Sequence, residues 1–295
     1  MIVVKLMGGL GNQMFQYAFG RSLALKNNTE LKLDLSFLED KTHRENFTYR
    51  DYELNVFAIQ ANIASQKEIS PFQKSRKRKI IDYLLLNLSI KPNNFYLKEP
   101  HFNYFAKALS APKNTYAEGY WQSEKYFINC RAELLNEFFP KEKIVSENKS
   151  LADKIHTENA VSLHVRRGDY VSSAHNNNFH GTCDKGYYLK AIELITQKVD
   201  NPVFYVFSDE PQWFRENFNI NFPVHVVEQN SGKNSYWDMY LMSQCKHHII
   251  ANSSFSWWGA WLNKNEDKIV VAPKNWFRDT SMNTQDLIPS NWIKI

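Results

Sequence analysis

A strand, a glycine turn and a helix can be read from residues 1–19, MIVVKLMGGLGNQMFQYAF. Ile2–Leu6 is a short apolar run, which predicts a buried strand, and glycines follow at once. The apolar residues of the next segment recur at helical spacing: Phe15, Ala18, Phe19 and Leu23. Residues 31–35, LKLDL, then alternate as a second strand would. This order is typical of a βαβ unit in an α/β protein.

The second half of the chain repeats this alternation more clearly. Residues 160–165 predict a strand, and a helix follows from apolar residues spaced by three and four: Tyr188, Ile192, Ile195 and Val199. Short β-branched runs predict further strands at 203–207, 224–227, 248–251 and 269–272. Strands that alternate with helices indicate a doubly wound parallel sheet. We place a domain boundary near residue 155, in the polar stretch after Pro140, which gives domains 1–155 and 156–295.

The composition is that of a folded protein. Of the 295 residues, 43% are hydrophobic and 15% aromatic, which excludes a disordered chain. The net charge of +5 suits a nucleotide diphosphate, a nucleic acid or an acidic membrane, and does not choose among them. The three cysteines, Cys130, Cys183 and Cys245, are far apart, so we expect neither a disulfide framework nor a structural zinc site. This cysteine usage indicates a reducing, cytoplasmic compartment.

A basic run, residues 74–79 (KSRKRK), precedes a leucine-rich stretch around Leu84. A solvated surface is the ordinary explanation of such a run. Basic residues beside an amphipathic helix also favour anionic lipid, so the alternative is a peripheral contact with the inner membrane. No apolar stretch reaches the roughly 18 residues of a membrane span. Residues 2–6 are too short for the apolar region of a secretion signal.

Residues 164–170, HVRRGDY, directly follow a predicted strand. Open α/β sheets bind ligands at the carboxyl ends of their strands. Alternation along the strand places His164 and Arg166 on one face and Arg167 on the other. We therefore expect one arginine to bind a phosphate bidentately while the other pairs with Asp169. A surface Arg–Asp pair of little energetic value is the alternative.

Polar residues also stand at other strand ends. In residues 207–210, FSDE, the Asp209 carboxylate could accept hydrogen bonds from a nucleoside, act as a base, or cap the next helix. Residues 252–259, NSSFSWWG, offer hydroxyls and helix N–H groups to an anion, although serines also cap helices for structural reasons. Residues 8–13, GGLGNQ, let a ligand approach the backbone, although glycine turns are common in βαβ units without a ligand.

The sequence holds no Asp-x-Asp pair and no His or Cys cluster with the spacing of a metal site. Charge that develops on a departing diphosphate would therefore fall to arginine and to helix N-termini. We expect a metal-independent reaction that uses no cofactor.

Five segments together resemble the bacterial family 11 glycosyltransferases, the α-1,2-fucosyltransferases. They are residues 8–17 (GGLGNQMFQY), 119–127 (GYWQSEKYF), 164–170, 207–210 and 253–258 (SSFSWW). The resemblance covers nearly the whole chain. It implies a GT-B-like fold, with two Rossmann-type domains facing across a cleft. The N-terminal domain would bind the acceptor and the C-terminal domain would bind GDP-fucose.

The resemblance also implies a reaction and its residues. L-fucose would pass with inversion from GDP-β-L-fucose to the 2-hydroxyl of a terminal galactoside, forming an α-1,2 linkage. Arg166 would contact the β-phosphate, and His164 would lie on the guanosine side. The phosphates would be cradled by Ser253, Ser254, Phe255 and Ser256, and the cleft would be lined from the other domain by Gly9, Gly11 and Asn12. The catalytic residues would be Arg166, Asp169 and Asp209.

The resemblance leaves the base and the acceptor contacts open. The general base is one of three carboxylates, Asp169, Asp209 and Glu118. The motif 207–210 departs from the family pattern because Glu210 stands where a second aspartate is common. The acceptor would be positioned by Tyr120, Trp121, Gln122 and His180. Core packing is the alternative for the two aromatic residues.

The acceptor and the linkage are identified less firmly than the donor. The His-x-Arg-Arg-x-Asp pattern is shared with α-1,6- and protein O-fucosyltransferases, so a fucosyltransferase of another linkage is the first alternative. A nonenzymatic basic protein that binds nucleic acid is the last, since no recognition motif is present. We expect as acceptor a galactoside oligosaccharide or a lipid-linked precursor in bacterial surface glycan biosynthesis.

Overall fold

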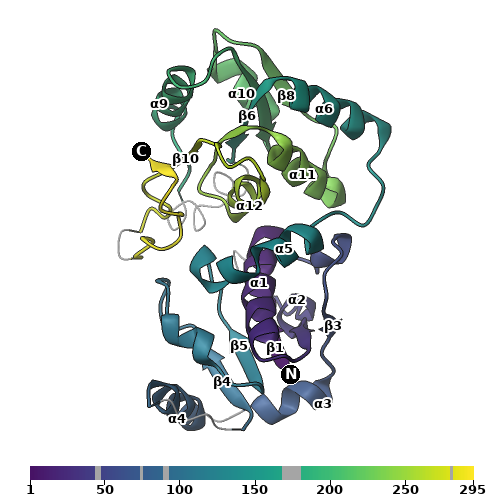
Figure 1. Cartoon of the computed structure of the whole chain (residues 1–295), viewed down its shortest axis with the longest axis vertical. Coiled ribbons are helices and arrows are strands. Elements are labelled where there is room, and N and C mark those ends of the chain that lie inside the picture. The colour runs from purple at the N-terminus through teal and green to yellow at the C-terminus, as the bar shows by residue number, and fades with distance from the viewer. Residues whose placement is uncertain (44–47, 74–75, 89–92, 168–180, 280–281) are drawn as a thin grey trace. The chain divides into compact units, whose positions relative to one another are not determined.

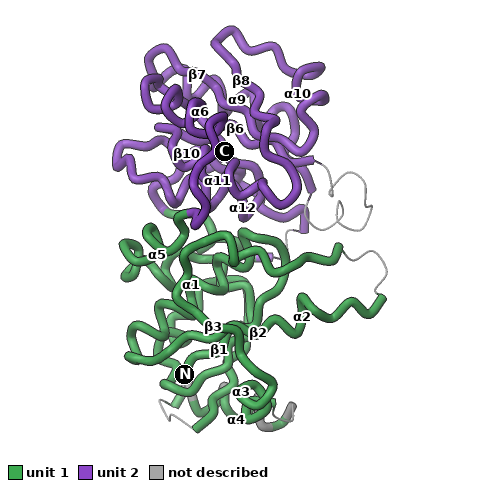
Figure 2. The backbone as a smooth tube through the Cα atoms, turned by 90° about the vertical axis from the view of Figure 1, so that its right-hand side faces the viewer, with its two compact units in different colours: residues 1–139, 283–289 green, residues 140–282, 290–295 purple. Residues whose placement is uncertain are grey.

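The computed structural model describes residues 1–43, 48–73, 76–88, 93–167, 181–279 and 282–295. The chain forms two compact units (Figure 2). Unit 1 consists of residues 1–139 and 283–289, and unit 2 consists of residues 140–282 and 290–295.

Unit 1 is built on a parallel sheet with the strand order β3-β2-β1-β5-β4. Figure 1 labels four of these strands, β1, β3, β4 and β5. Its strands are β1 (Ile2–Lys5), β2 (Leu31–Asp34), β3 (Asn62–Ile63), β4 (Phe95–Lys98) and β5 (Thr115–Glu118). The chain runs outward from β1 through β2 to β3, and later strands add on the other side of β1. The direction therefore reverses between β1 and β5, which is the topological switch point of this sheet.

The longest helix of unit 1, α1 (Leu10–Lys26), packs directly beside β1. The other helices are α2 (Ser36–Glu39), α3 (Gln66–Ile69), α4 (Arg76–Asn87) and α5 (Arg131–Glu137). Short 3-10 turns lie at η1 (Leu54–Val56), η2 (Ser70–Phe72), η3 (Ala106–Ser110), η4 (Glu124–Tyr126) and η5 (Ile128–Cys130). Gly20 makes the close approach of α1 to the sheet possible. A Cβ atom on Gly20 would lie 2.3 Å from a methyl group of Val4 and 2.8 Å from one of Leu31.

Unit 2 is built on a parallel sheet with the order β11-β10-β9-β6-β7-β8. Its strands are β6 (Asn159–Val165), β7 (Pro202–Ser208), β8 (Val224–Val227), β9 (His247–Ile249), β10 (Val270–Ala272) and β11 (Ile293–Lys294). Its helices are α6 (Ser146–Thr157), α9 (Lys185–Thr196), α10 (Pro211–Asn217), α11 (Tyr236–Gln244) and α12 (Ser254–Leu262), with a 3-10 turn at η6 (Gly232–Asn234). Here the switch point lies between β6 and β9.

Helices cover both faces of the unit 2 sheet, and the strand residues alternate between two cores. Val161, Leu163 and Val165 pack with α9 residues such as Ile195 on one face. Ala160, Tyr205 and Phe207 pack with residues of α6 and α11 on the other face. Strands buried on both sides are continuous apolar runs, which is why the sequence shows them so clearly.

The predicted fold class is confirmed. Both units are α/β with parallel sheets, as a GT-B-like pair of Rossmann-type domains requires. The strands expected at 160–165, 203–207 and 224–227 are present as β6, β7 and β8. The chain divides between Phe139 and Pro140, whereas the sequence placed the boundary near residue 155. The division falls earlier because α6 packs against β6 and α11 of unit 2.

No helix among the described residues is both long enough and apolar enough to span a membrane.

Replacing Gly20 with alanine should lower the free energy of unfolding by about 1–3 kcal/mol, because the new methyl group overpacks the contact between α1 and the sheet. Denaturant titration of the purified variant measures this change. Gly186→Ala in α9 is the matched control, since its new Cβ would meet only the Asp184 side chain, at 3.2 Å. Equal stability of Gly20→Ala and the wild type would contradict the packing argument.

Candidate functional site

Two arginines follow β6, and carboxylates that follow β7 hold both of them. The Asp209 Oδ2 atom lies 3.1 Å from the Arg166 Nε atom, and Asp209 Oδ1 accepts the Arg167 backbone N–H at 2.9 Å. The Arg167 Nε atom pairs with Glu210 Oε2 at 3.2 Å, and its guanidinium carbon lies 3.8 Å from the centre of the Trp213 ring. The Arg166 and Arg167 side chains are 25% and 22% exposed, so they are oriented by protein groups and accessible to a ligand.

This pairing answers one question left open by the sequence. Because Val165 and Ser208 are register partners in β6 and β7, the residues that follow both strands lie side by side. Asp209 therefore contacts the arginines. The alternative that its side chain caps α10 is wrong, since the N-cap residue is Glu210 and no side-chain hydrogen bond within the described residues caps this helix. Asp169, the expected arginine partner, lies outside the described residues.

His164 is buried at the end of β6, with 5% of its surface exposed. Burial, together with the charge of Arg166, lowers its pKa to about 3, so the ring is neutral at pH 7. Its Nδ1 atom is buried and has no hydrogen-bond partner within the described part of the chain. A buried polar atom is costly until a ligand or water satisfies it. A neutral imidazole offers one donor and one acceptor, which suits the polar edge of a nucleoside.

The N-terminus of α12 lies beside this histidine, since the ring centres of His164 and Phe255 are 5.9 Å apart. Ser253 is the N-cap residue, and its Oγ atom accepts the Phe255 N–H at 3.3 Å. The Ser256 hydroxyl is buried and donates to the Ser253 carbonyl at 3.3 Å. The capping explanation thus holds for Ser253. Ser254, the first helical residue, is half-buried at the helix end where the dipole favours an anion.

These clusters converge because β6 pairs with β7 on one side and with β9 on the other. Arg166 follows β6, Asp209 follows β7, and Ser253 lies shortly after β9. All three therefore stand at the carboxyl edge of the sheet, beside the switch point between β6 and β9. This is the position where open α/β sheets bind ligands.

In unit 1 the glycine turn is held by buried amide side chains. Gly8 has a φ of +74°, and a Cβ there would lie 2.5 Å from the Asn12 Nδ2 atom, so the turn requires glycine. The Gln13 Nε2 atom donates to the Gly8 carbonyl at 2.9 Å and the Asp51 carbonyl at 2.8 Å. The Gln16 Oε1 atom accepts the Met7 N–H at 2.9 Å.

The start of α1 differs from the expectation of free N–H groups. Burial raises the pKa of Glu53, and the nearby Leu10 N–H opposes this shift, so a carboxylate of the protein itself lies at this helix end. Gly9 is the N-cap residue, and Gly11 is buried in the first turn. Their expected role, lining a ligand cleft, stays a prediction.

The segment 119–122 follows β5 and is held in an unusual backbone conformation. Trp121 has a φ of +55° and is fully buried, with its ring stacked 4.0 Å from that of Phe19. Core packing therefore accounts for Trp121, whereas Tyr120 is 39% exposed. The Gln122 Nε2 atom donates to Asn12 Oδ1 at 2.7 Å. This bond links the segments after β5 and β1 across the switch point of unit 1.

Polar side chains at the carboxyl ends of β1, β2 and β5 line a pocket of about 200 Å³ in unit 1. The Lys5 Nζ atom lies 3.7 Å from Glu118 Oε2, and the Tyr96 hydroxyl donates to the same carboxylate. The Tyr116 hydroxyl donates to Asp34 at 2.5 Å. Glu118, one of the expected bases, therefore stands in a polar pocket at the sheet edge.

A family model described as glycosyl transferase family 11 matches residues 1–295. The chain belongs to glycosyltransferase family 11.

Three relatives of this family 11 chain are informative. It is 37% identical to an Escherichia coli protein named alpha-1,2-colitosyltransferase, over 100% of the chain and 98% of the relative. It is also 37% identical to the Escherichia coli O-antigen biosynthesis glycosyltransferase WbnK, over 98% of the chain and 99% of the relative. Rat galactoside alpha-(1,2)-fucosyltransferase 2 is 28% identical, over 92% of the chain and 69% of the relative. Glycosyl transfer is therefore the activity of the family, and the sugar differs among relatives.

Among solved structures, Arabidopsis thaliana FUT1 matches with a TM-score of 0.49 and 14% identity, over 93% of this chain and 71% of that one.

The predicted site residues of the family 11 chain form one cluster in each unit. Unit 2 gathers His164, Arg166, Asp209 and the serines of α12, and unit 1 joins Asn12 to Gln122. Asp169 and His180 lie outside the described residues.

Two carboxylates were missed by the sequence reasoning. Glu99 follows β4, and its two oxygens accept the N–H groups of Tyr120 at 2.7 Å and Trp121 at 3.0 Å, which holds the strained segment in place. Glu53 lies close to the first N–H of α1. The signal for Glu99 was its place at the end of a strand, the criterion that found Asp209. The sequence analysis predicted no strand between residues 40 and 150, so this signal was not used.

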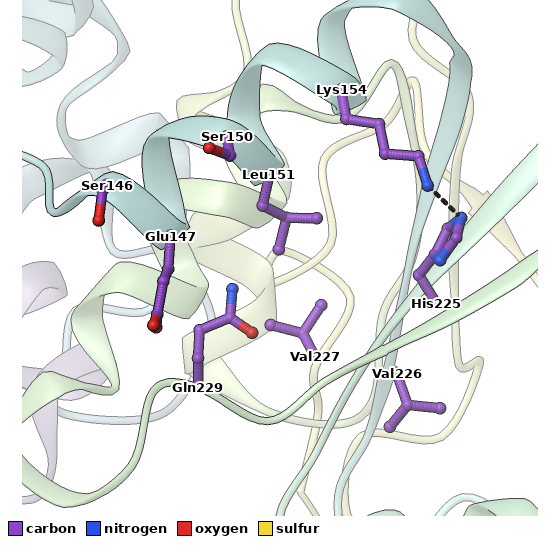
Figure 3. A pocket seen from close by; sticks show the side chains of 9 residues that line it. All are labelled: Ser146, Glu147, Ser150, Leu151, Lys154, His225, Val226, Val227 and Gln229. Atoms are coloured by element: carbon purple, nitrogen blue, oxygen red, sulfur yellow. Dashed lines mark hydrogen bonds between the residues drawn. The ribbon is translucent and has the colours of Figure 1, made fainter.

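A larger surface pocket, of about 610 Å³, lies between α6 and the edge strand β8 of unit 2 (Figure 3). It is lined by Ser146, Glu147, Ser150, Leu151, Lys154, His225, Val226, Val227 and Gln229. The Lys154 Nζ atom lies 2.9 Å from His225 Nε2, and burial together with this charge lowers the pKa of His225. None of these lining residues belongs to the predicted site, and we assign the pocket no part in the reaction.

Glu99 predicts a pH dependence of stability. Burial raises its pKa from 4.5 to about 7, so its ionisation opposes folding. Its contribution is most favourable below pH 4.5 and is lost as the pH rises through about 7. Glu99→Gln removes this titration. The unfolding temperature of the wild type minus that of the variant should therefore fall over this pH range in calorimetry.

The matched control is Glu133→Gln on the exposed surface of α5, which removes one negative charge without touching the segment 119–122. A wild-type minus Glu99→Gln difference that is constant from pH 4.5 to about 7 would show that Glu99 does not titrate as described.

Proposed function

We propose that the chain transfers L-fucose, with inversion, from GDP-β-L-fucose to the 2-hydroxyl of a terminal galactoside, forming an α-1,2 linkage. The observation that carries the donor half is the pair of arginines that Asp209 and Glu210 orient at the switch point of unit 2. Family membership supplies the reaction class. The rat relative, a galactoside alpha-(1,2)-fucosyltransferase by name, supports the sugar and the linkage.

In the proposed reaction the acceptor oxygen attacks the anomeric carbon while the bond from that carbon to the β-phosphate oxygen breaks. Negative charge grows on the departing GDP, and Arg166 and the N-terminus of α12 would stabilise it. His164, which is neutral, would contribute hydrogen bonds to the nucleoside and no charge. The acceptor proton passes to a general base. We propose that no metal ion takes part, since fixed guanidinium groups and the N-terminus of α12 would stabilise the leaving phosphate in place of a divalent cation.

The roles of the carboxylates follow from their contacts. Asp209 holds Arg166 and the Arg167 backbone, so we assign it to positioning the donor-binding arginines. The base is then sought among Glu118, which stands in the polar pocket of unit 1, and Asp169.

A second donor is favoured by a specific observation. The relative named alpha-1,2-colitosyltransferase is 37% identical over the whole chain, more than the rat fucosyltransferase at 28%. Colitose is L-fucose without its 3-hydroxyl group. The two donors share the diphosphate and the configuration that the arginine cluster would bind. GDP-colitose is therefore the second candidate, with the same linkage.

The biological acceptor is proposed to be a glycan of the bacterial surface, free or lipid-linked, handled in the cytoplasm. Support comes from the relative WbnK, whose name places it in O-antigen biosynthesis.

The protein is incubated with GDP-fucose or GDP-colitose as donor, with lactose or another terminal galactoside as acceptor, and with EDTA to remove metal ions. We expect an α-1,2-linked product. Linkage analysis by NMR identifies it. Transfer of colitose in preference to fucose would show that GDP-colitose, and not GDP-fucose, is the donor. Failure of both sugars on every galactoside would overturn the proposal, and activity abolished by EDTA and restored by a divalent cation would overturn its metal-free chemistry.

Arg166→Ala should lower kcat/KM by about a hundredfold or more, since it removes the guanidinium group that would donate hydrogen bonds to the leaving phosphate. Arg166→Lys restores the charge but not the planar fork, and should recover only part of the loss. Asp209→Asn should lower activity while changing the free energy of unfolding by less than about 1 kcal/mol, because the Arg166 and Asp209 side chains are 25% and 24% exposed and an ion pair that solvent screens contributes little to stability. Arg215→Ala breaks an exposed pair with Glu228 in the same unit and is the control. Wild-type activity of Arg166→Ala would remove Arg166 from the mechanism.

A further inference from the structure

Helix α4 lies at the edge of unit 1, beside the edge strand β4 (Figure 1). Several of its exposed side chains form an apolar stripe. Ile80, Ile81 and Leu84 are 55%, 42% and 55% exposed, and Leu88, just after the helix, is 69% exposed. At about 100° per residue these four side chains and the exposed Lys77 fall within an arc of about 100°. Large apolar side chains gathered on one exposed helix face mark an interaction surface.

The opposite face of α4 fixes the direction of this stripe. Asp82 is fully buried, and its Oδ2 atom accepts the Tyr96 backbone N–H at 3.1 Å. Tyr96 belongs to β4, the strand against which α4 packs. The apolar stripe is therefore turned away from the sheet by a specific contact.

The charge of α4 identifies the kind of surface that it fits. Residues 76–79 are Arg-Lys-Arg-Lys, and the first turn of the helix contains no acidic residue. Positive charge at a helix N-terminus opposes the helix dipole, and like charges one turn apart repel each other. This arrangement destabilises the isolated helix. An anionic surface would offset both effects and would accept the neighbouring apolar stripe.

We propose that α4 docks unit 1 on the surface of an anionic lipid bilayer. The helix lies in the plane of the interface, with Ile80, Ile81 and Leu84 at the boundary of headgroups and acyl chains and the basic turn among the headgroups. A second copy of the chain fits less well, because a two-fold contact would bring two positively charged helices together. The inference does not depend on the sugar or the acceptor.

The test is flotation of the full chain with vesicles of phosphatidylcholine, alone or mixed with phosphatidylglycerol. We expect binding to the mixed vesicles at low salt and release at high salt. The pair Ile80→Ser with Leu84→Ser, and separately the pair Lys77→Glu with Arg78→Glu, should each reduce the bound fraction about tenfold or more. The control is Leu189→Ser with Lys190→Ser, an exposed apolar and basic pair on α9 of unit 2, which should bind as the wild type does.

Hydrogen–deuterium exchange of the wild type gives a measurement that requires no variant. The amides of residues 76–88 should become protected when phosphatidylglycerol vesicles are added. The proposal is overturned if the wild type does not bind the mixed vesicles, if both α4 variants bind as tightly as the wild type, or if α4 is protected by self-association without lipid. Vesicle binding is measured without any sugar donor, so its failure is separate from a failure of the proposed transfer.

Discussion

The carboxylate of Asp209 ties together the ends of two neighbouring parallel strands, and the donor side of the candidate site depends on this contact. One oxygen holds the Arg166 side chain, and the other holds the Arg167 backbone. The contact is possible because β6 and β7 are paired in register to their last residues. The same sheet brings α12 and its serines to the other side of β6. A parallel register thus converts three separated motifs into one surface.

Much of this arrangement can be predicted from the sequence, because buried parallel strands are continuous apolar runs and their carboxyl ends share an edge. That reasoning found Arg166, Asp209 and Ser253. It could not find the pairing of Arg167 with Glu210 and Trp213, which depends on side-chain directions after the strands end. It also missed Glu99, whose importance comes from a positive φ at Trp121 that local pattern does not reveal. The domain boundary was placed too late because an amphipathic helix such as α6 does not indicate which sheet it covers.

The identity of the transferred sugar is harder to predict from the sequence than the position of the site. Fucose and colitose differ in one hydroxyl group, and a site gains selectivity for a hydroxyl by placing one or two hydrogen-bonding groups against it. In the proposed function, the arginine cluster would contact the diphosphate, the part of the donor that both sugars share. Relatives that are 37% and 28% identical and carry different sugar names agree with this division. Under the proposed function, the sheet edge would recognise the diphosphate, and a few further side chains, which general sequence patterns do not mark, would distinguish the two sugars.

The local charge balance argues for orientation as the main contribution of the arginine cluster. Arg166 and Arg167 face two carboxylates, Asp209 and Glu210, so the four charged groups sum to zero before a ligand arrives. Arginines without carboxylate partners would attract a diphosphate more strongly. That attraction would be the same in the ground state and in the transition state, and the arginine side chains would not be held in one position. In the proposed reaction, guanidinium groups that are already held in place would stabilise the charge that grows on the leaving phosphate without having to reorganise. The arginine cluster attracts an anionic ligand less strongly than unpaired arginines would, but its guanidinium groups are held in fixed positions. This balance is expected of a site that stabilises a leaving phosphate.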